Sequence, residues 1–300
     1  MERKGVLRMV GRIIASADGW VSQYSPADGW LEQSVDIPGA GAMCVSRSAV
    51  FCAGEGGLIW RLHPRTLSPQ ALFSGGPGVQ VMCLSGDERR LYALCAEGDS
   101  VLMCSAEDGR ALLLNRAGVN PQGMTLSDDG KTLLVAGGES AQVLLFCPHT
   151  LRLLRALSAP GIVCAAAAFG GVVYALCMDD TLSSVLVTFP PGGQRRSLRL
   201  EGLPGGLFLR RGGLVAAAEQ RLYTVSSCGR RVLAVRSVPG RAGRLLACGM
   251  AEFLLDAMGE RLYEHWGGGW RCIRCGVKDT VCVGGAHKQP AAGAGCGEGT

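Results

Sequence analysis

Acidic side chains recur along this 300-residue chain at points where a cation-binding surface could form. The proposed binding set is Asp18, Glu55, Glu97, Glu139, Asp179, Glu219 and Asp256. Carboxylates gathered on one side of a protein create a negative potential that attracts a cation or a cationic ligand. Acidic residues are also common in tight turns, where they bond to the local backbone, so a purely structural role remains open.

The CxxC motif of Cys272 and Cys275 has the spacing of a half zinc site. The sequence contains no second such pair. The surrounding run is expected to be a strand, in which residues three apart point to opposite faces. We therefore expect the two thiols to diverge, unless a bulge intervenes, and to be structural.

The remaining reactive side chains show no catalytic pattern. The four histidines, at 63, 149, 265 and 287, have neither helical nor paired spacing, and there is no GxSxG elbow, Walker loop or dinucleotide fingerprint. A Ser-His-Asp set assembled from distant residues stays open. The sequence therefore predicts no catalytic residue, no metal and no cofactor.

The elements that must position these residues are clearest in residues 119–160. Apolar runs at 123–127, 132–136, 142–146 and 151–157 are separated by turns, the first of which is Asp128-Asp129-Gly130. Short apolar runs divided by such turns are typical of an antiparallel meander. The segment is expected to form four strands.

Weaker copies of this unit run along the chain. The turn between the third and fourth strands recurs every 42 residues, at Thr66, Asp108, Thr150 and Gly192. First strands are centred on Cys44, Cys83, Thr125 and Cys164, less clearly near Phe208 and Ala247, and finally on Cys282. One meander cannot bury both of its faces, so copies must stack, and a closed ring hides the terminal faces. The prediction is an all-β, seven-bladed β-propeller of four-stranded antiparallel blades.

We expect one propeller domain over residues 1–283. Its blades should lie near 11–39, 40–78, 79–118, 119–160, 161–203, 204–240 and 241–276. The strand at 277–283 should join the first blade, which lacks a first strand, and close the ring. The alternative is that Val6–Val10 fills this place. The glycine-rich tail, 284–300, should be disordered.

The core of the fourth unit, PQGMTLSDDGKTLLVAGG, resembles YVTN-repeat propellers, whereas the glycine-histidine and tryptophan-aspartate signature of WD40 rings is absent. Propellers of this repeat type are similar to the seven-bladed lactonase family, which hydrolyses phosphosugar lactones. No active-site residue of that family can be placed on this sequence. The resemblance therefore implies a WD40-like ring fold and leaves activity open.

Composition limits the setting and the partners. The segment after Arg3-Lys4 is interrupted by Arg8 and Arg12 before an apolar core develops, so no secretory signal is expected and the 14 cysteines should be reduced in the cytoplasm. No apolar stretch is long enough to span a membrane.

Net charge is +5, and arginines concentrate on the predicted fourth strands. Charge on these outer edges prevents pairing with other molecules, although an anionic partner at the rim is an alternative. Without interleaved aromatic residues, single-stranded nucleic acid is not expected to bind.

These features favour a non-catalytic, monomeric cytoplasmic propeller that binds a protein partner or a small ligand through one face. A lactone hydrolase of the phosphogluconolactonase type is the alternative, and a purely structural subunit is a third possibility.

Overall fold

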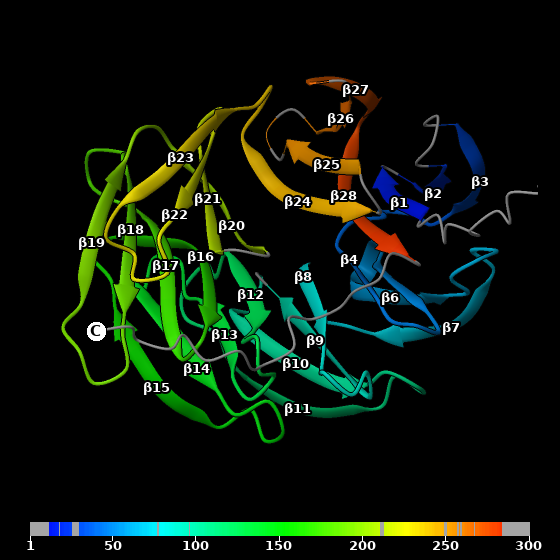
Figure 1. Cartoon of the computed structure of the whole chain (residues 1–300). Helices are drawn as coiled ribbons and strands as arrows, with labels where there is room; N and C mark the ends of the chain where they lie inside the picture. Colours follow the sequence, from blue (N-terminus) through cyan, green and yellow to red (C-terminus); the bar gives the residue numbers. More distant parts are fainter. Residues whose placement is uncertain are drawn as a thin grey trace, which may run out of the picture.

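The computed structural model describes residues 12–17, 19–25, 30–76, 78–95, 97–210, 213–248, 251–256, 258, 260–266 and 268–283. Over these segments the chain forms 28 strands in seven four-stranded antiparallel sheets, which are arranged as the blades of a ring (Figure 1). This architecture confirms the predicted seven-bladed propeller. No helix in the described segments is long and apolar enough to span a membrane.

The four strands of each blade run from the innermost to the outermost in the following order. Blade 1 contains β28 (Val277–Val283), β1 (Arg12–Ala17), β2 (Trp20–Tyr24) and β3 (Leu31–Asp36). Blade 2 contains β4 (Met43–Val45), β5 (Val50–Ala53), β6 (Leu58–Leu62) and β7 (Pro69–Ser74), with the short 3-10 helix η1 (Glu55–Gly57) before β6. Blade 3 contains β8 (Val79–Leu84), β9 (Arg90–Cys95), β10 (Ser100–Ser105) and β11 (Ala111–Arg116).

The other four blades follow the same order. Blade 4 contains β12 (Gly123–Leu126), β13 (Leu133–Ala136), β14 (Gln142–Phe146) and β15 (Leu153–Ser158). Blade 5 contains β16 (Ile162–Phe169), β17 (Val172–Met178), β18 (Ser184–Phe189) and β19 (Arg196–Leu200). Blade 6 contains β20 (Pro204–Arg210), β21 (Gly213–Ala218), β22 (Arg221–Val225) and β23 (Val232–Ser237). Blade 7 contains β24 (Ala242–Cys248), β25 (Ala251–Asp256), β26 (Arg261–Trp266) and β27 (Gly269–Cys275).

The core lies between neighbouring blades, and β13 shows why the sequence builds it. Side chains along a strand point alternately to its two faces. Leu133 and Val135 pack in the cluster shared with blade 3, whereas Leu134 and Ala136 pack in the cluster shared with blade 5. All four are fully buried. Burying one leucine side chain stabilises the fold by about 1.5–3 kcal/mol. Because β13 buries apolar side chains on both of its faces, it holds blade 4 to blade 3 and to blade 5.

The ring is closed by the C-terminal strand, as predicted. β28 pairs antiparallel with β1, with Ile13 opposite Cys282 and Ile14 opposite Val281. Val281 packs with Met43 of blade 2, and Cys282 packs with Phe253 of blade 7. The alternative strand, Val6–Val10, and the tail at 284–300 lie outside the described residues.

Candidate functional site

Six of the seven predicted acidic residues lie at the turn between the second and third strands of their blades. They are Glu55, Glu97, Glu139, Asp179, Glu219 and Asp256, in blades 2 to 7. Asp18 lies outside the described residues. Consecutive strands are antiparallel, so these turns and the connections between blades emerge on one face of the ring, which we call the turn face.

The acidic turns contact the connections that lead into their own blades. A Cβ atom added to Gly202 would lie 2.4 Å from the Cβ of Glu219, and Gly202 has a φ of +92°, a conformation that favours glycine. The same approach of a connection glycine to an acidic residue occurs at Gly39 and Glu55, Gly78 and Glu97, Gly161 and Asp179, and Gly240 and Asp256. The acidic recurrence is therefore part of how consecutive blades are joined.

Hydrogen bonds engage several of these carboxylates. The Leu203 amide donates to Glu219 Oε2 at 3.2 Å, and the Glu219 amide donates to the Leu203 carbonyl at 2.8 Å. The Asn120 side-chain amide donates to Glu139 Oε1 at 3.2 Å. These bonds connect the turn of one blade to the chain that arrives from the previous blade.

Asp179 and Asp256 are buried within their turns. Asp179 Oδ1 accepts hydrogen bonds from the Thr181 hydroxyl at 2.6 Å and from the amides of Thr181 and Ser183, both at 3.0 Å. These bonds, with the Thr181 hydroxyl as the largest contribution, lower the pKa of Asp179. Asp256 Oδ1 accepts from the Met258 amide at 3.2 Å. Both carboxylates stabilise their own turns and are not presented to a ligand.

Glu55 and Glu97 are exposed, and the described part of the chain offers neither carboxylate a hydrogen bond or an ion pair. Nor do three His, Cys, Asp or Glu side chains of the described residues gather as a metal site. The turn face thus carries separated charges, and no shared metal cage appears among the described residues.

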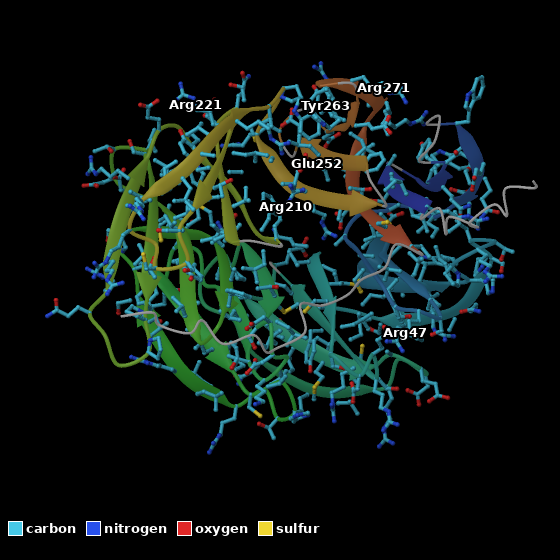
Figure 2. All side chains as sticks on the ribbon, in the orientation of Figure 1. Arg47, Arg210, Arg221, Glu252, Tyr263 and Arg271 are labelled. Carbon is cyan, nitrogen blue, oxygen red and sulfur yellow. The ribbon has the colours of Figure 1, made fainter. Side chains whose placement is uncertain are left out.

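The turn face contains a hollow of about 410 Å³ at blade 6. It is lined by Glu201, Gly202, Glu219, Gln220, Arg221, Ser237 and Val238. Arg221, labelled in Figure 2, forms an ion pair with Glu201. The lining contains two carboxylates, Glu201 and Glu219, and one guanidinium group, Arg221, so the hollow has a net negative charge. Such a site suits a cationic group that also donates hydrogen bonds.

The acidic pattern in the sequence indicated Glu219 but neither Glu201 nor Arg221. Glu201 comes directly after β19 in blade 5, whereas Arg221 begins β22 in blade 6. Both residues could have been predicted from the path of the chain between blades. Each connecting segment passes over the acidic turn of the blade that it enters. The residues that flank Gly202 are therefore neighbours of Glu219 and Arg221.

A second hollow, of about 370 Å³, lies along the side of blade 6 that packs against blade 7, and its lining includes Arg210 and Arg236. Figure 2 shows Arg210 beside Glu252 of blade 7. Arg236 binds the same carboxylate through two hydrogen bonds of 2.7 and 2.9 Å. Burial acts to raise the pKa of Glu252, but the hydrogen bonds of Arg236 and the charge of Arg210 lower it overall. This ion-pair cluster joins blades 6 and 7.

A third cluster lies at the seam where the ring closes. The buried carboxylate of Asp279, in β28, accepts the Met43 amide at 2.6 Å and Arg244 Nε at 2.8 Å. Arg244 Nη1 also lies 3.2 Å from the carbonyl oxygen of Thr280. Burial raises the pKa of Asp279, although Arg244 and the backbone amides oppose this effect. The cluster links blades 7, 1 and 2.

The thiols of Cys272 and Cys275 do not diverge, because the exception stated for this strand, an intervening bulge, applies. Their Sγ atoms lie 3.9 Å apart. The physical reason is a β-bulge: Tyr263 pairs with Cys272 and Leu262 pairs with Arg274, which leaves Ile273 without a partner. One extra residue in a strand reverses the alternation of the side chains that follow it.

The histidines are dispersed. His63 Nδ1 lies 3.2 Å from the Thr66 amide in a turn of blade 2, and the ring of His265 packs edge-on against Trp270, with centroids 5.0 Å apart. His149 occupies the turn between β14 and β15. His287 lies outside the described residues.

The chain is a seven-bladed β-propeller, and solved structures share this fold. A functionally unknown protein from Desulfotomaculum acetoxidans DSM 771 matches with a TM-score of 0.74 and 9% identity, covering 91% of this chain and 99% of that chain. A putative 6-phosphogluconolactonase from Bacteroides fragilis NCTC 9343 matches with a TM-score of 0.70 and 10% identity, covering 94% and 100%. BamB from Moraxella catarrhalis matches with a TM-score of 0.60 and 12% identity, covering 83% and 80%.

No family model matches the sequence, and no curated protein matches it. Identities this low show a common fold, and one fold carries many functions. The likeness to a lactonase-like propeller is confirmed, whereas the YVTN character of the repeat stays a prediction.

Proposed function

We propose that this propeller is a non-catalytic binding protein that takes a small ligand or a protein partner through its turn face. The observation that carries the proposal is the hollow of about 410 Å³ at blade 6, in which Glu201 and Glu219 outnumber Arg221. A cationic group in the hollow would replace or share the ion pair between Glu201 and Arg221. The exposed carboxylates of Glu55 and Glu97 extend the negative field along the same face.

We further propose that the protein is a monomer in a reducing cytoplasm. The twelve cysteines whose state the structure describes are all free thiols, and six of them are buried. Free thiols of this number suit a compartment that keeps cysteine reduced.

The test uses spermidine as a cationic probe and isothermal titration calorimetry as the readout. Glu201→Gln combined with Glu219→Gln removes two negative charges but keeps the oxygen acceptor that the Leu203 amide uses. We expect the double variant to weaken spermidine binding at least about tenfold, or 1.4 kcal/mol. Its unfolding free energy should change by less than about 1 kcal/mol, since exposed ion pairs contribute little.

Glu107→Gln is the matched control. Glu107 is exposed in the turn between β10 and β11, on the opposite face of the ring, and its substitution should leave binding unchanged. Equal weakening by the control and the double variant would show that only net charge matters. Absence of spermidine binding to the unmodified protein would refute a cation site.

The second candidate is lactone hydrolysis, which the fold shared with the putative 6-phosphogluconolactonase favours. Purified protein incubated with 6-phosphogluconolactone should leave the spontaneous hydrolysis rate unchanged if the protein only binds. An accelerated rate that scales with protein concentration would favour the hydrolase instead.

A further inference from the structure

The Cys272–Cys275 pair is an exposed dithiol that the binding function does not use. Both residues lie on β27, the outermost strand of blade 7, and both are exposed. Within the described segments β27 pairs only with β26. The outer edge of this strand is therefore open to small molecules.

The bulge that unites the thiols has an unusual position. In blades 1, 2, 3, 4 and 6, the register shift between the third and fourth strands lies at the turn that joins them. In blade 7 the shift lies at the opposite end, at Ile273, near the connection to β28. Its effect is to put two cysteines on one side of an edge strand.

The geometry is suited to a disulfide. A sulfur–sulfur bond is about 2.05 Å long, so the two Sγ atoms, now 3.9 Å apart, need to approach by about 2 Å. Disulfide formation therefore requires side-chain rotation and backbone adjustment at the bulge, and no further strand of the described segments pairs with the outer edge of β27 to oppose it. A strand held on both edges would resist it.

The surroundings are cationic. Arg261 stands directly opposite Cys275 in the strand register. Burial and a hydrogen bond with Cys275 raise the pKa of Cys272, while the charge of Arg261 acts to lower it. The two sulfurs share a hydrogen bond, and the neighbouring guanidinium group of Arg261 favours a thiolate.

We propose that Cys272 and Cys275 form a redox-active dithiol site that undergoes exchange with a low-molecular-weight disulfide of the glutathione class. One thiolate attacks a sulfur of the small disulfide, forms a mixed disulfide and releases one small thiolate. The other cysteine loses its proton to solvent, attacks the protein sulfur of the mixed disulfide and releases the second small thiolate. Two electrons pass from the protein to the small disulfide, and the protein gains one internal sulfur–sulfur bond.

The intramolecular second step distinguishes this pair from the other exposed thiol among the described cysteines. Cys228 lies in the turn between β22 and β23, and hydrogen bonding to Ser226 lowers its pKa. No second cysteine of the described residues stands beside it, so it can form only a mixed disulfide. Cys228 therefore serves as an internal control, because it is an exposed thiol with a lowered pKa that lacks a second cysteine to complete a disulfide.

The test treats the reduced full-length protein with oxidised glutathione in glutathione buffers, followed by acid quenching, alkylation and trypsin. Cleavage after Arg271, Arg274 and Lys278 places the two cysteines on separate peptides, 272–274 and 275–278. The proposal predicts these peptides joined by a disulfide. Half-oxidation should need at least about tenfold less oxidised glutathione than half-modification of Cys228, because the second step is intramolecular.

Variants separate the pair from general thiol reactivity. Cys272→Ser and Cys275→Ser should each abolish the joined peptides and accumulate a mixed disulfide at the remaining cysteine. Cys228→Ser should leave the joined peptides unchanged. Phenylarsine oxide, which needs two neighbouring thiols, should protect both cysteines from alkylation in the unmodified protein and neither in the single variants.

Two results would overturn the proposal. One is two separate glutathione adducts on peptides 272–274 and 275–278 without a joined species. The other is an unreacted pair at concentrations that fully modify Cys228. Either result is independent of whether the turn face binds cations.

Discussion

The seam between the C-terminal strand and its neighbours provides the sharpest test of the fold. Asp279 is 6% exposed and accepts the Met43 amide and Arg244 Nε, so one carboxylate bonds to both blades that flank blade 1. The perturbation is Arg244→Met, which keeps an unbranched apolar side chain over the first four positions but removes the guanidinium group. A buried anion is left without its ion pair.

Breaking a buried ion pair by removing one partner costs about 3–5 kcal/mol, since the remaining charge is uncompensated. The Arg244 side chain is 29% exposed, and two backbone amides still serve Asp279, so we expect about 3 kcal/mol. Asp279→Asn should cost less, about 1–3 kcal/mol, because Arg244 can turn to solvent. The double variant should recover part of the loss from Arg244→Met.

Equilibrium unfolding in urea measures these differences in unfolding free energy. The direction in which the unfolding free energy changes with pH is an independent test. Burial raises the folded-state pKa of Asp279 above its ordinary value, so the folded chain binds this proton more tightly than the unfolded chain. The stability linked to it is present below the unfolded pKa and is lost as pH rises through the folded pKa. Arg244→Met should deepen this loss, and Asp279→Asn should remove it. A cost below about 1 kcal/mol for Arg244→Met, with no change in the pH profile, would refute the proposed seam.

Three further predictions concern other parts of the ring. Deleting residues 277–300 should destabilise the whole domain because β1 loses its inner partner and keeps only β2, whereas deleting 284–300 should have little effect; equal melting temperatures would contradict closure by β28. Replacing Glu55, Glu97 and Glu139 together with glutamine should weaken spermidine binding, because the negative field of the turn face is reduced while the hollow at blade 6 is kept, and should leave the urea midpoint almost unchanged; unchanged affinity in titration calorimetry would speak against a contribution of these three carboxylates. Gly138→Ala should destabilise the protein by at least about 1–3 kcal/mol, because its Cβ would lie 1.9 Å from the Asn120 carbonyl oxygen at a φ of +55°; Gly130→Ala, also at positive φ but with nothing within 4 Å, is the control, and equal costs in urea would refute the steric reason.

The repeated pattern was sufficient to predict the ring because each blade forms from short apolar strands that alternate with turns along the sequence. Leu133 and Leu134 are adjacent apolar residues, and a strand that is apolar at consecutive positions must bury both faces. The turn spacing and the orphan strand around Cys282 then indicated the number of blades and the closure. These features depend on residue types and on their spacing along the chain, both of which can be read from the sequence.

The side-chain clusters could not be predicted from the sequence, because they depend on how strands and blades are placed in space. The convergence of Cys272 and Cys275 depends on a one-residue bulge whose position varies between blades, and no residue type at 273 specifies it. The pairing of Arg244 with Asp279 depends on side chains from different blades meeting at the seam. Likewise, the acidic turns were recognised, but their contact with connection glycines such as Gly202 required the path of the chain between blades.

The composite first blade makes the two ends of the chain mutually dependent during folding. β1 and β28 are separated by about 260 residues in sequence, whereas the strands of every other blade are consecutive. Pairing across such a separation carries a large loop-closure entropy unless the intervening blades have already formed. We therefore expect the other six blades to assemble from neighbouring segments and the first blade to be completed last, when β28 pairs with β1.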